Sequence, residues 1–397
     1  MRVLFLLFLL CLMACLTACG GGGAGVSGDV GSTPMSPPVA AASNVLAMVV
    51  GPGPSNNINI PFVSVRVCTP GTSVCRTIDN VLVDTGSTGL RLLNTALNNL
   101  ALPAQTNANS AITLECAQFL SFVVWGPVRQ ADVYLGDKLA ASVPIQVIAD
   151  PAHPVVPSNC SSAGPVVTTV SDLHANGVLG IGSFVNDGQR YYNCSPTSTS
   201  TRCPAVLLPS QQVQNPVALF DADNNGVVLQ LPAVSATGAR QLAGAVIFGV
   251  GTRSNNQLGD ALVLQTDSRG FFNTTYKGVS LANSFIDSGS NGLYFPDAAI
   301  PACAGALTDF FCPAMMQSLS ATVRLSGGSA ETLAFSIGNA SSLLASNNFV
   351  YNNLGGDLNS AGFDWGLPFF FGRRVFTVIE GRTSPAGVGP QVAYTRL

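Results

Sequence analysis

Charged residues are scarce in this chain of 397 residues, at 9% of the total, and only two of its 17 basic residues are lysines. The 20 Asp and Glu outnumber these basic residues, so no basic patch is available to bind a phosphate backbone. The composition therefore excludes nucleic acid as a partner. The chain also has only two histidines, no C-x-x-C motif and no G-x-S-x-G motif. We therefore expect neither a metal site nor a serine-hydrolase triad, and we predict no cofactor.

A long amphipathic helical pattern is also missing. Short alternating runs at 62–67 (FVSVRV) and 332–338 (TLAFSIG), together with 41 Gly and 25 Pro, predict an all-β fold. The folded part, about 350 residues, is larger than one ordinary core. We therefore expect two lobes, at 45–235 and 236–397.

The N-terminus predicts export. Residues 1–18 are uncharged from Val3 onward, which is too short for a membrane span and typical of a signal peptide. Residues 16–19 (LTAC) resemble a bacterial lipobox, in which Cys19 becomes the lipidated first residue; the alternative is an ordinary signal peptide with a coincidental cysteine. Residues 19–44 are rich in Gly, Pro and Ser and read as a flexible tether. We expect a lipoprotein anchored in the membrane, with Gly20 favouring the outer membrane, on its periplasmic or surface face.

The cysteines agree with export. Three of the 11 lie at or before the lipobox, and the other eight predict four disulfides, although eight cysteines allow 105 pairings. Short spacings favour three of the pairs, and elimination leaves the fourth: Cys68–Cys75, Cys194–Cys203, Cys303–Cys312 and Cys116–Cys160.

The stretch NVLVDTGSTGLRLL (80–93) brings an apolar strand to a single acid, Asp84, before a Gly-rich turn. A buried carboxyl is costly unless it is paired, hydrogen-bonded or protonated, so we expect a partner. The stretch NSFIDSGSNGLYF (283–295) repeats this plan around Asp287, and the two motifs agree at Asp, Gly, Ser, Gly and Leu. One such turn is weak evidence, because Asp-Ser-Gly strings are ordinary turns. Two of them, one in each half, predict a carboxyl pair.

Both motifs resemble the catalytic loops of the pepsin-like aspartic proteases. The segments 176–182 (NGVLGIG) and 364–380 resemble the strands that cross behind those loops, and 244–260 resembles the crossover between the lobes. The resemblance implies two pepsin-like double-ψ β-barrel lobes and a cleft between them that binds an extended polypeptide. One departure from the family's pattern concerns the glycine of the second crossing strand. If Leu367 is aligned with that pattern, Pro368 stands in the place of the glycine. After a small shift of the alignment, Gly366 would take that place. We expect a monomer.

The resemblance also implies roles for eight residues. Asp84 and Asp287 would share one proton and activate a water molecule between them. The supporting residues would be hydroxyls that reach the opposite loop, glycines that leave room for backbone N–H groups, and hydroxyls on the outer carboxylate oxygens: Thr85 and Ser288, Gly86 and Gly289, Ser87 and Ser290. Because the outer hydroxyls favour the ionised form, we expect a pH optimum below 6.

Pepsin-like proteases close a hairpin tipped by an aromatic residue over the substrate. The best match is Trp125, before a predicted turn at Gly126-Pro127, although the usual Tyr-Gly-x-Gly is absent; the alternative is a packed or exposed loop tryptophan. The sequence thus predicts an aspartic endopeptidase. The alternatives are a pepsin-like binding module on the cell surface with negligible turnover, and a hydrolase that acts on a non-peptide bond.

Overall fold

The computed structural model describes residues 42–194, 204–205, 207–358 and 361–396, and within these ranges no helix is longer than five residues. The predicted all-β class is confirmed. The two alternating runs of the sequence fall in β2 (Pro61–Cys68) and β18 (Ala330–Ile337). In the described ranges no helix has the length and apolarity needed to cross a membrane. The predicted signal peptide, the lipidation site Cys19 and most of the tether lie outside the described residues.

Most strands belong to one of two sheets. Six strands of the larger sheet close into a barrel, because β2 pairs with β3 on one side and with β6 on the other. Closure removes the free strand edges that an open sheet would expose. The β3–β8 and β4–β7 pairs are parallel, and the other pairs around the barrel are antiparallel. In order, the strands after β2 are β3 (Cys75–Asp84), β8 (Gly177–Ile181), β4 (Thr88–Leu93), β7 (Lys138–Ile148) and β6 (Val123–Leu135).

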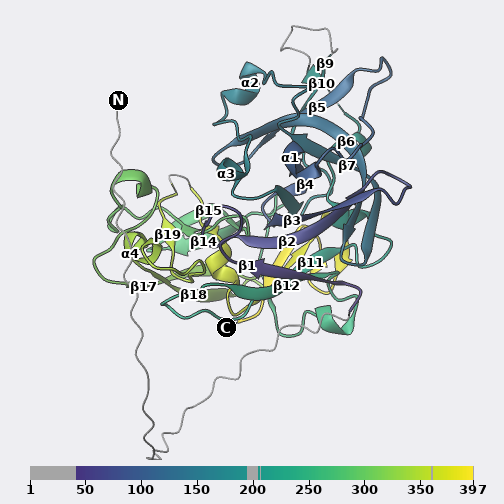
Figure 1. Ribbon diagram of the computed structural model, residues 1–397. Helices are drawn as coiled ribbons and strands as arrows, with labels where there is room; N and C mark the ends of the chain where they lie inside the picture. Colours follow the sequence, from purple (N-terminus) through teal and green to yellow (C-terminus); the bar gives the residue numbers. More distant parts are fainter. Residues whose placement is uncertain (1–41, 195–203, 206, 359–360, 397) are drawn as a thin grey trace, which may run out of the picture. The chain divides into compact units, whose positions relative to one another are not determined.

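The same sheet continues past the barrel in both directions (Figure 1). Beyond β6 it adds β5 (Ile112–Gln118), β9 (Arg190–Cys194) and β10 (Pro204–Ala205). Beyond β2 it adds β1 (Val45–Val50), β12 (Leu242–Phe248), β11 (Gly226–Gln230), β21 (Arg374–Val378), β24 (Gln391–Tyr394) and β13 (Leu262–Val263). Strands from both sides of residue 235 therefore share this sheet, and the lobe boundary at that residue stays a prediction.

A second sheet of seven strands carries the later motif. Its order starts from β18 and runs through β17 (Gln317–Arg324), β14 (Phe272–Tyr276), β15 (Val279–Ile286), β20 (Asp364–Trp365), β16 (Leu293–Tyr294) and β19 (Gly355–Gly356). A separate hairpin joins β22 (Thr383–Ser384) to β23 (Gly387–Val388).

The centres of the two sheets repeat one connection pattern. In the first, β8 lies parallel to β3 and antiparallel to β4, and β4 lies parallel to β7. In the second, β20 lies parallel to β15 and antiparallel to β16, and β16 lies parallel to β19. The repeat puts Asp84, the last residue of β3, and Asp287, which follows β15, at matching positions.

The helices are short connections between strands. The α-helices are α1 (Asn94–Leu97), α2 (Ser158–Ser161), α3 (Val170–Leu173) and α4 (Ala340–Leu344). The 3-10 helices are η1 (Pro209–Gln211), η2 (Pro216–Leu219), η3 (Ser254–Asn256), η4 (Gly305–Leu307) and η5 (Leu367–Phe370). None of them is long enough to cover a sheet face, so strands and loops supply the packing.

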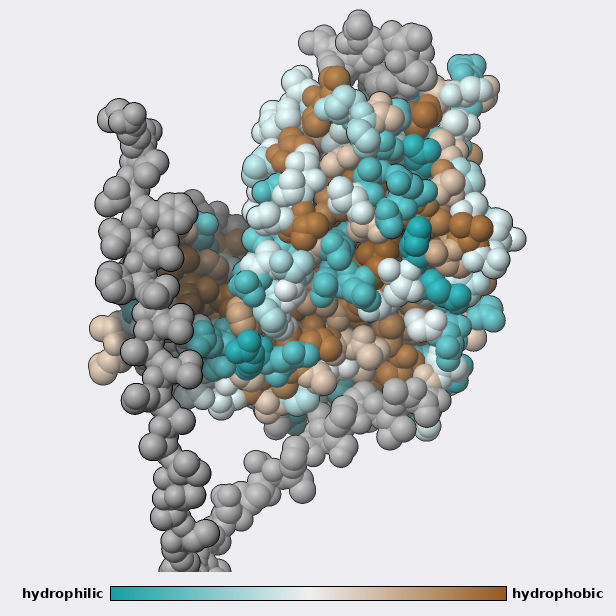
Figure 2. Space-filling view, in the orientation of Figure 1, coloured by the Kyte–Doolittle hydropathy of each residue, from teal (hydrophilic) through white to brown (hydrophobic). Residues whose placement is uncertain are grey.

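Three of the four predicted disulfides are confirmed: Cys68–Cys75, Cys116–Cys160 and Cys303–Cys312. Cys203 lies outside the described residues, so its pairing with Cys194 stays a prediction. Hydrophobic and hydrophilic residues are intermixed over the face shown in Figure 2.

Candidate active site

Two carboxyl groups, one from each sheet, meet at a single backbone amide. The N–H of Gly86 donates to Oδ1 of Asp84 at 2.8 Å and to Oδ1 of Asp287 at 3.0 Å. Both acids are buried, with 5% and 8% of their surface exposed. The structure thus brings together the two acids of the repeated motif, and their catalytic role stays a prediction.

Reciprocal hydrogen bonds tie the two loops together beneath the acids. The Thr85 N–H donates to Oγ of Ser288 at 3.1 Å, and the Ser288 N–H donates to Oγ1 of Thr85 at 2.9 Å. The Ser288 hydroxyl then donates to the carbonyl oxygen of Val83 at 2.8 Å. Both hydroxyl residues are buried, so these bonds are shielded from water and hold the carboxyl pair in place.

Two glycines make the close approach of the carboxyls possible. A Cβ on Gly86 would lie 2.6 Å from Cγ of Asp287, and a Cβ on Gly289 would lie 2.9 Å from Cγ of Asp84. A side chain at either position would therefore collide with the opposite carboxyl. The Gly289 N–H uses this space to donate to Oδ1 of Asp287 at 2.7 Å.

The outer carboxylate oxygens bind the two predicted serines. The Ser87 hydroxyl donates to Oδ2 of Asp84 at 2.5 Å, and the Ser290 hydroxyl donates to Oδ2 of Asp287 at 3.1 Å. Each acid thus receives the same kind of donor from the third residue after it.

A glycine packs closely against each loop, one in the crossing strand β8 and the other directly after β20. A Cβ on Gly180 of β8 would lie 2.8 Å from Oγ of Ser87, and a Cβ on Gly366 would lie 2.6 Å from the carbonyl oxygen of Ser290. Gly366 is therefore the counterpart of Gly180, in agreement with the shifted alignment. Pro368 is inside η5, near its start, where proline is tolerated.

The surroundings of Asp287 favour its protonated form. Burial raises the pKa of Asp287 well above its ordinary range, and the charges of Asp84 and Asp364 raise it further, while the Gly289 N–H lowers it. The expected pH optimum below 6 stays a prediction.

Asp364 in β20 is a third buried acid, which the sequence analysis missed. Burial raises its pKa to about 8, against a hydrogen bond from Ser290 that lowers it. A signal was present in the sequence, because this acid stands alone in the apolar run AGFDWGLPFFF (361–371).

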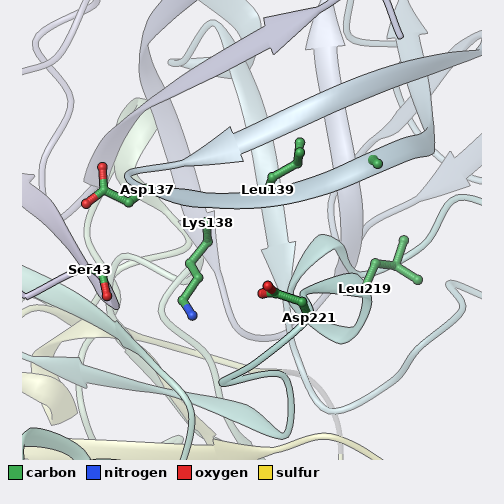
Figure 3. Close-up of a pocket in the computed structure, with 7 residues that line it drawn as sticks. Ser43, Asp137, Lys138, Leu139, Leu219 and Asp221 are labelled. Carbon is green, nitrogen blue, oxygen red and sulfur yellow. The ribbon is translucent and has the colours of Figure 1, made fainter. Parts of the chain in front are cut away.

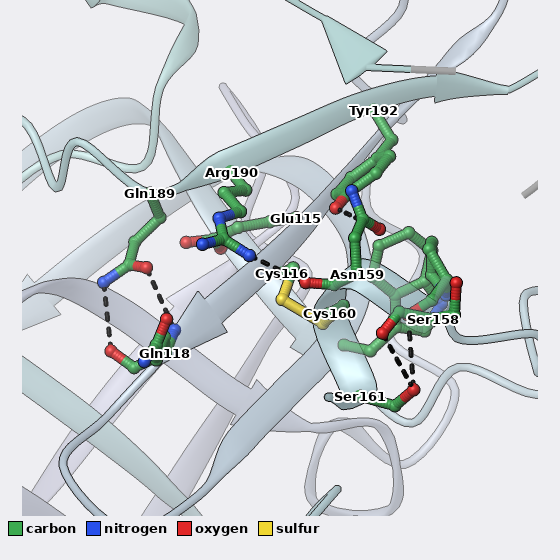
Figure 4. Close-up of a disulfide and its surroundings, with 12 residues drawn as sticks. Glu115, Cys116, Gln118, Ser158, Asn159, Cys160, Ser161, Gln189, Arg190 and Tyr192 are labelled. Carbon is green, nitrogen blue, oxygen red and sulfur yellow. Dashed lines mark hydrogen bonds between the residues drawn. A yellow bond between two sulfur atoms is a disulfide. The ribbon is translucent and has the colours of Figure 1, made fainter. Parts of the chain in front are cut away.

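The prediction that Trp125 tips a hairpin over the site is wrong. This residue lies inside β6, with 4% of its surface exposed, and its indole N–H donates to the carbonyl oxygen of His153 at 3.1 Å. It packs edge-on against Tyr192 beside the Cys116–Cys160 disulfide, whose surroundings are shown in Figure 4.

The predicted turn at Gly126-Pro127 is part of the same strand. A Cβ on Gly126 would lie 1.8 Å from the carbonyl oxygen of Val147, so this glycine serves close contact between strands. The loop of the β5–β6 hairpin is instead residues 119–122, where Phe119 stacks on Phe122 and Leu120 is exposed.

A buried ion cluster lies next to the Asp84 loop and was also missed. Arg91 of β4 donates to Glu115 and Asp187 at 2.6 Å each and to the carbonyl oxygen of Thr88 at 2.6 Å. The Thr88 contact fixes the end of the turn that carries Ser87. A lone arginine in the apolar run GLRLL was the available signal.

Two hollows lined by described residues lie away from the carboxyl pair. Figure 3 shows one lined by Ser43, Asp137, Lys138, Leu139, Ala141, Leu219 and Asp221. The ammonium of Lys138 is bound there to Asp223 at 2.6 Å. Across the described ranges, no group of three or more His, Cys, Asp or Glu has an arrangement that could hold a metal ion.

The fold and the site define an all-β protein in which two sheets each contribute one acid to a buried carboxyl pair. The chain belongs to the family described as "Protein of unknown function (DUF3443)", whose family model matches residues 40–394. It is similar to the crystal structure of aspartic proteinase from Irpex lacteus, with 15% identity, 89% of this chain and 97% of that chain covered, and a TM-score of 0.49. No curated protein matches the sequence.

Proposed function

We propose that this protein is a pepsin-like aspartic endopeptidase, which hydrolyses peptide bonds with a water molecule held by Asp84 and Asp287. The observation that carries the proposal is that one backbone N–H, that of Gly86, donates to a carboxylate oxygen of each acid. Two buried carboxyls in contact lower stability, because they cannot both ionise without strong repulsion. Proteins tolerate such a cost where chemistry needs it.

Asp287 is the general acid of the proposed mechanism, because burial and its two acidic neighbours raise its pKa. Asp84 is the base. It takes a proton from the water as the water oxygen bonds to the substrate carbonyl carbon, while Asp287 gives its proton to the carbonyl oxygen. As the resulting diol collapses, Asp84 passes its proton to the amine nitrogen, the C–N bond breaks, and Asp287 recovers a proton from a diol hydroxyl.

The substrate we propose is an extended polypeptide, recognised through apolar side chains in a cleft between the lobes. The protein would act as a monomer outside the cytoplasm, where disulfides are stable. A lipid on Cys19 would anchor it in the membrane, which we propose is the outer membrane.

A second candidate function is a binding module that retains the carboxyl pair but turns over little. The observation that favours it is the burial of Trp125 in β6, because this residue is then not available to close over a substrate.

Cleavage of an unfolded, apolar-rich protein between pH 3 and 8 tests the proposal, with fragments identified by mass spectrometry. We expect internal cleavage by the wild type and none by Asp84→Asn or Asp287→Asn, since each change keeps the shape but disables the shared proton. Asp309→Asn, which changes an exposed acid, is the matched control and should cleave normally. Cleavage by either pair variant would refute the mechanism, and binding without cleavage by the wild type would favour the second candidate.

A further inference from the structure

A buried asparagine that precedes β2 binds the backbone of the Asp287 loop. The side chain of Asn59 is fully buried, and its Nδ2 donates to the carbonyl oxygen of Asn291 at 2.8 Å. Asn291 is the fourth residue after Asp287, and it is 232 positions from Asn59 in the chain. The bond therefore connects the loop of the second acid to the segment that leads into the barrel of the first.

Further hydrogen bonds fix the Asn59 side chain itself. Its Nδ2 also donates to the carbonyl oxygen of Tyr351 at 2.9 Å, and its Oδ1 accepts from the Tyr351 N–H at 2.8 Å. The Asn59 N–H donates to the carbonyl oxygen of Phe349 at 2.8 Å. The backbone of Asn59 has a φ of 53°, a left-handed conformation that asparagine adopts more readily than most residues. The donor that faces Asn291 is thus held from both sides.

The loop of the first acid has a matching contact. Nη1 of Arg91 donates to the carbonyl oxygen of Thr88 at 2.6 Å, and Thr88 is the fourth residue after Asp84. Arg91 is buried, as Asn59 is. In each loop a buried side chain therefore binds the carbonyl of the fourth residue after the acid, although the two donors differ in type and in their place in the sequence.

The carbonyl one residue earlier is held in both loops by a backbone amide. The Gly182 N–H donates to the carbonyl oxygen of Ser87 at 2.9 Å, and the Leu367 N–H donates to that of Ser290 at 2.7 Å. The hydroxyls of these two serines bind the outer oxygens of the acids. The side-chain donors therefore hold the next carbonyl after the serine in each loop.

We propose that Asn59 is a positioning residue for Asp287. The proposal rests on the proposed function for its meaning in catalysis. By holding the Asn291 carbonyl, Asn59 fixes the backbone next to Ser290, and with it the direction from which the serine hydroxyl reaches the acid. Without Asn59, this carbonyl loses a buried donor, and the loop has to move to find another partner. A displacement of about 1 Å at a catalytic group can cost about 100-fold in rate.

Two substitutions test the role of Asn59 in turnover. Asn59→Gly removes the amide and accepts the positive φ. Asn59→Asp keeps the shape and the acceptor, but it has at most one donor for the two carbonyls. In both variants kcat should fall at least about 10-fold while KM stays within about twofold, because Asp287 acts in the transition state. Asn99→Gly is the matched control, since Asn99 is exposed and has a φ of 61°, and it should behave as the wild type. An unchanged kcat in the folded Asn59 variants would overturn the proposal.

Amide hydrogen exchange followed by mass spectrometry tests the same role without turnover. It compares residues 283–293, which include Asp287, with β4, which Arg91 holds. In Asn59→Gly the exchange of 283–293 should speed up at least about 10-fold more than that of β4, because the missing donor loosens one loop only. Equal changes in the two segments would indicate a general loss of stability and would overturn the role of Asn59.

The exchange measurement also separates this role from the proposed function. If 283–293 is loosened selectively while the wild type cleaves no peptide, the proposed function fails and the role of Asn59 in placing the Asp287 loop stands. If exchange of 283–293 is the same in Asn59→Gly and the wild type, the role of Asn59 fails even where cleavage by the wild type is normal.

Discussion

Replacing Asp364 by asparagine should change how the stability of the protein depends on pH. Burial raises the pKa of this acid to about 8 in the folded state, whereas its ordinary value is 3.8. Between these two values the folded state holds a proton that the unfolded state releases, so the free energy of unfolding falls as pH rises. One proton corresponds to about 1.4 kcal/mol per pH unit.

From pH 5 to pH 7 the titration of Asp364 should therefore remove about 3 kcal/mol of stability from the wild type. Asparagine does not titrate, so over the same interval the stability of Asp364→Asn should fall by about 3 kcal/mol less than that of the wild type.

The assay is urea unfolding of the purified protein with its disulfides intact, followed by tryptophan fluorescence at pH 5, 6 and 7. Asp309→Asn, at an exposed acid, is the control and should follow the wild type. Equal pH dependence in the wild type and Asp364→Asn would refute the reasoning, because Asp364 would then titrate like an exposed acid.

Two further predictions concern the loop glycine and the anchor. Gly86→Ala would place a Cβ 2.6 Å from Cγ of Asp287 and should reduce kcat/KM by about 100-fold or more, because it displaces the pair. Gly327→Ala, where a Cβ meets nothing within 4 Å, should be neutral, and equal rates for both variants would contradict the geometry. Cys19→Ser should release folded protein from membranes into the soluble fraction; a variant still bound after a high-salt wash would rule out the lipid anchor.

The sequence predicted those parts of the site whose residues lie close together within one short motif. The two Asp-Thr/Ser-Gly-Ser motifs each contain an acid, the glycine that admits the opposite carboxyl and the serine on the outer oxygen, so their spacing specified most of the contacts. The all-β class followed from short alternating runs, and three disulfides followed from loop spacing.

Features that depend on long-range register were missed or misread. The sequence suggested that Gly126 is a turn residue. It lies instead within a strand, where a side chain would collide with Val147 on the neighbouring strand. The true hairpin loop, residues 119–122, has three apolar residues out of four and contains neither Gly nor Pro. The burial of Asp364 depends on the two-residue strand β20, whose register pairs this acid with Phe285 of β15.

In the proposed mechanism, Asp84 and Asp287 together bind the tetrahedral intermediate of peptide hydrolysis. Calorimetry at pH 5 tests this by comparing the binding affinities of two peptides. In one, a secondary hydroxyl replaces the scissile carbonyl. The other is the same peptide with the intact amide bond, measured before cleavage occurs. We expect the wild type to bind the hydroxyl peptide at least about 100-fold more tightly than the amide peptide, and Asp84→Asn and Asp287→Asn each to lose this preference. Equal binding of the two peptides by the wild type, or an undiminished preference in either variant, would contradict it.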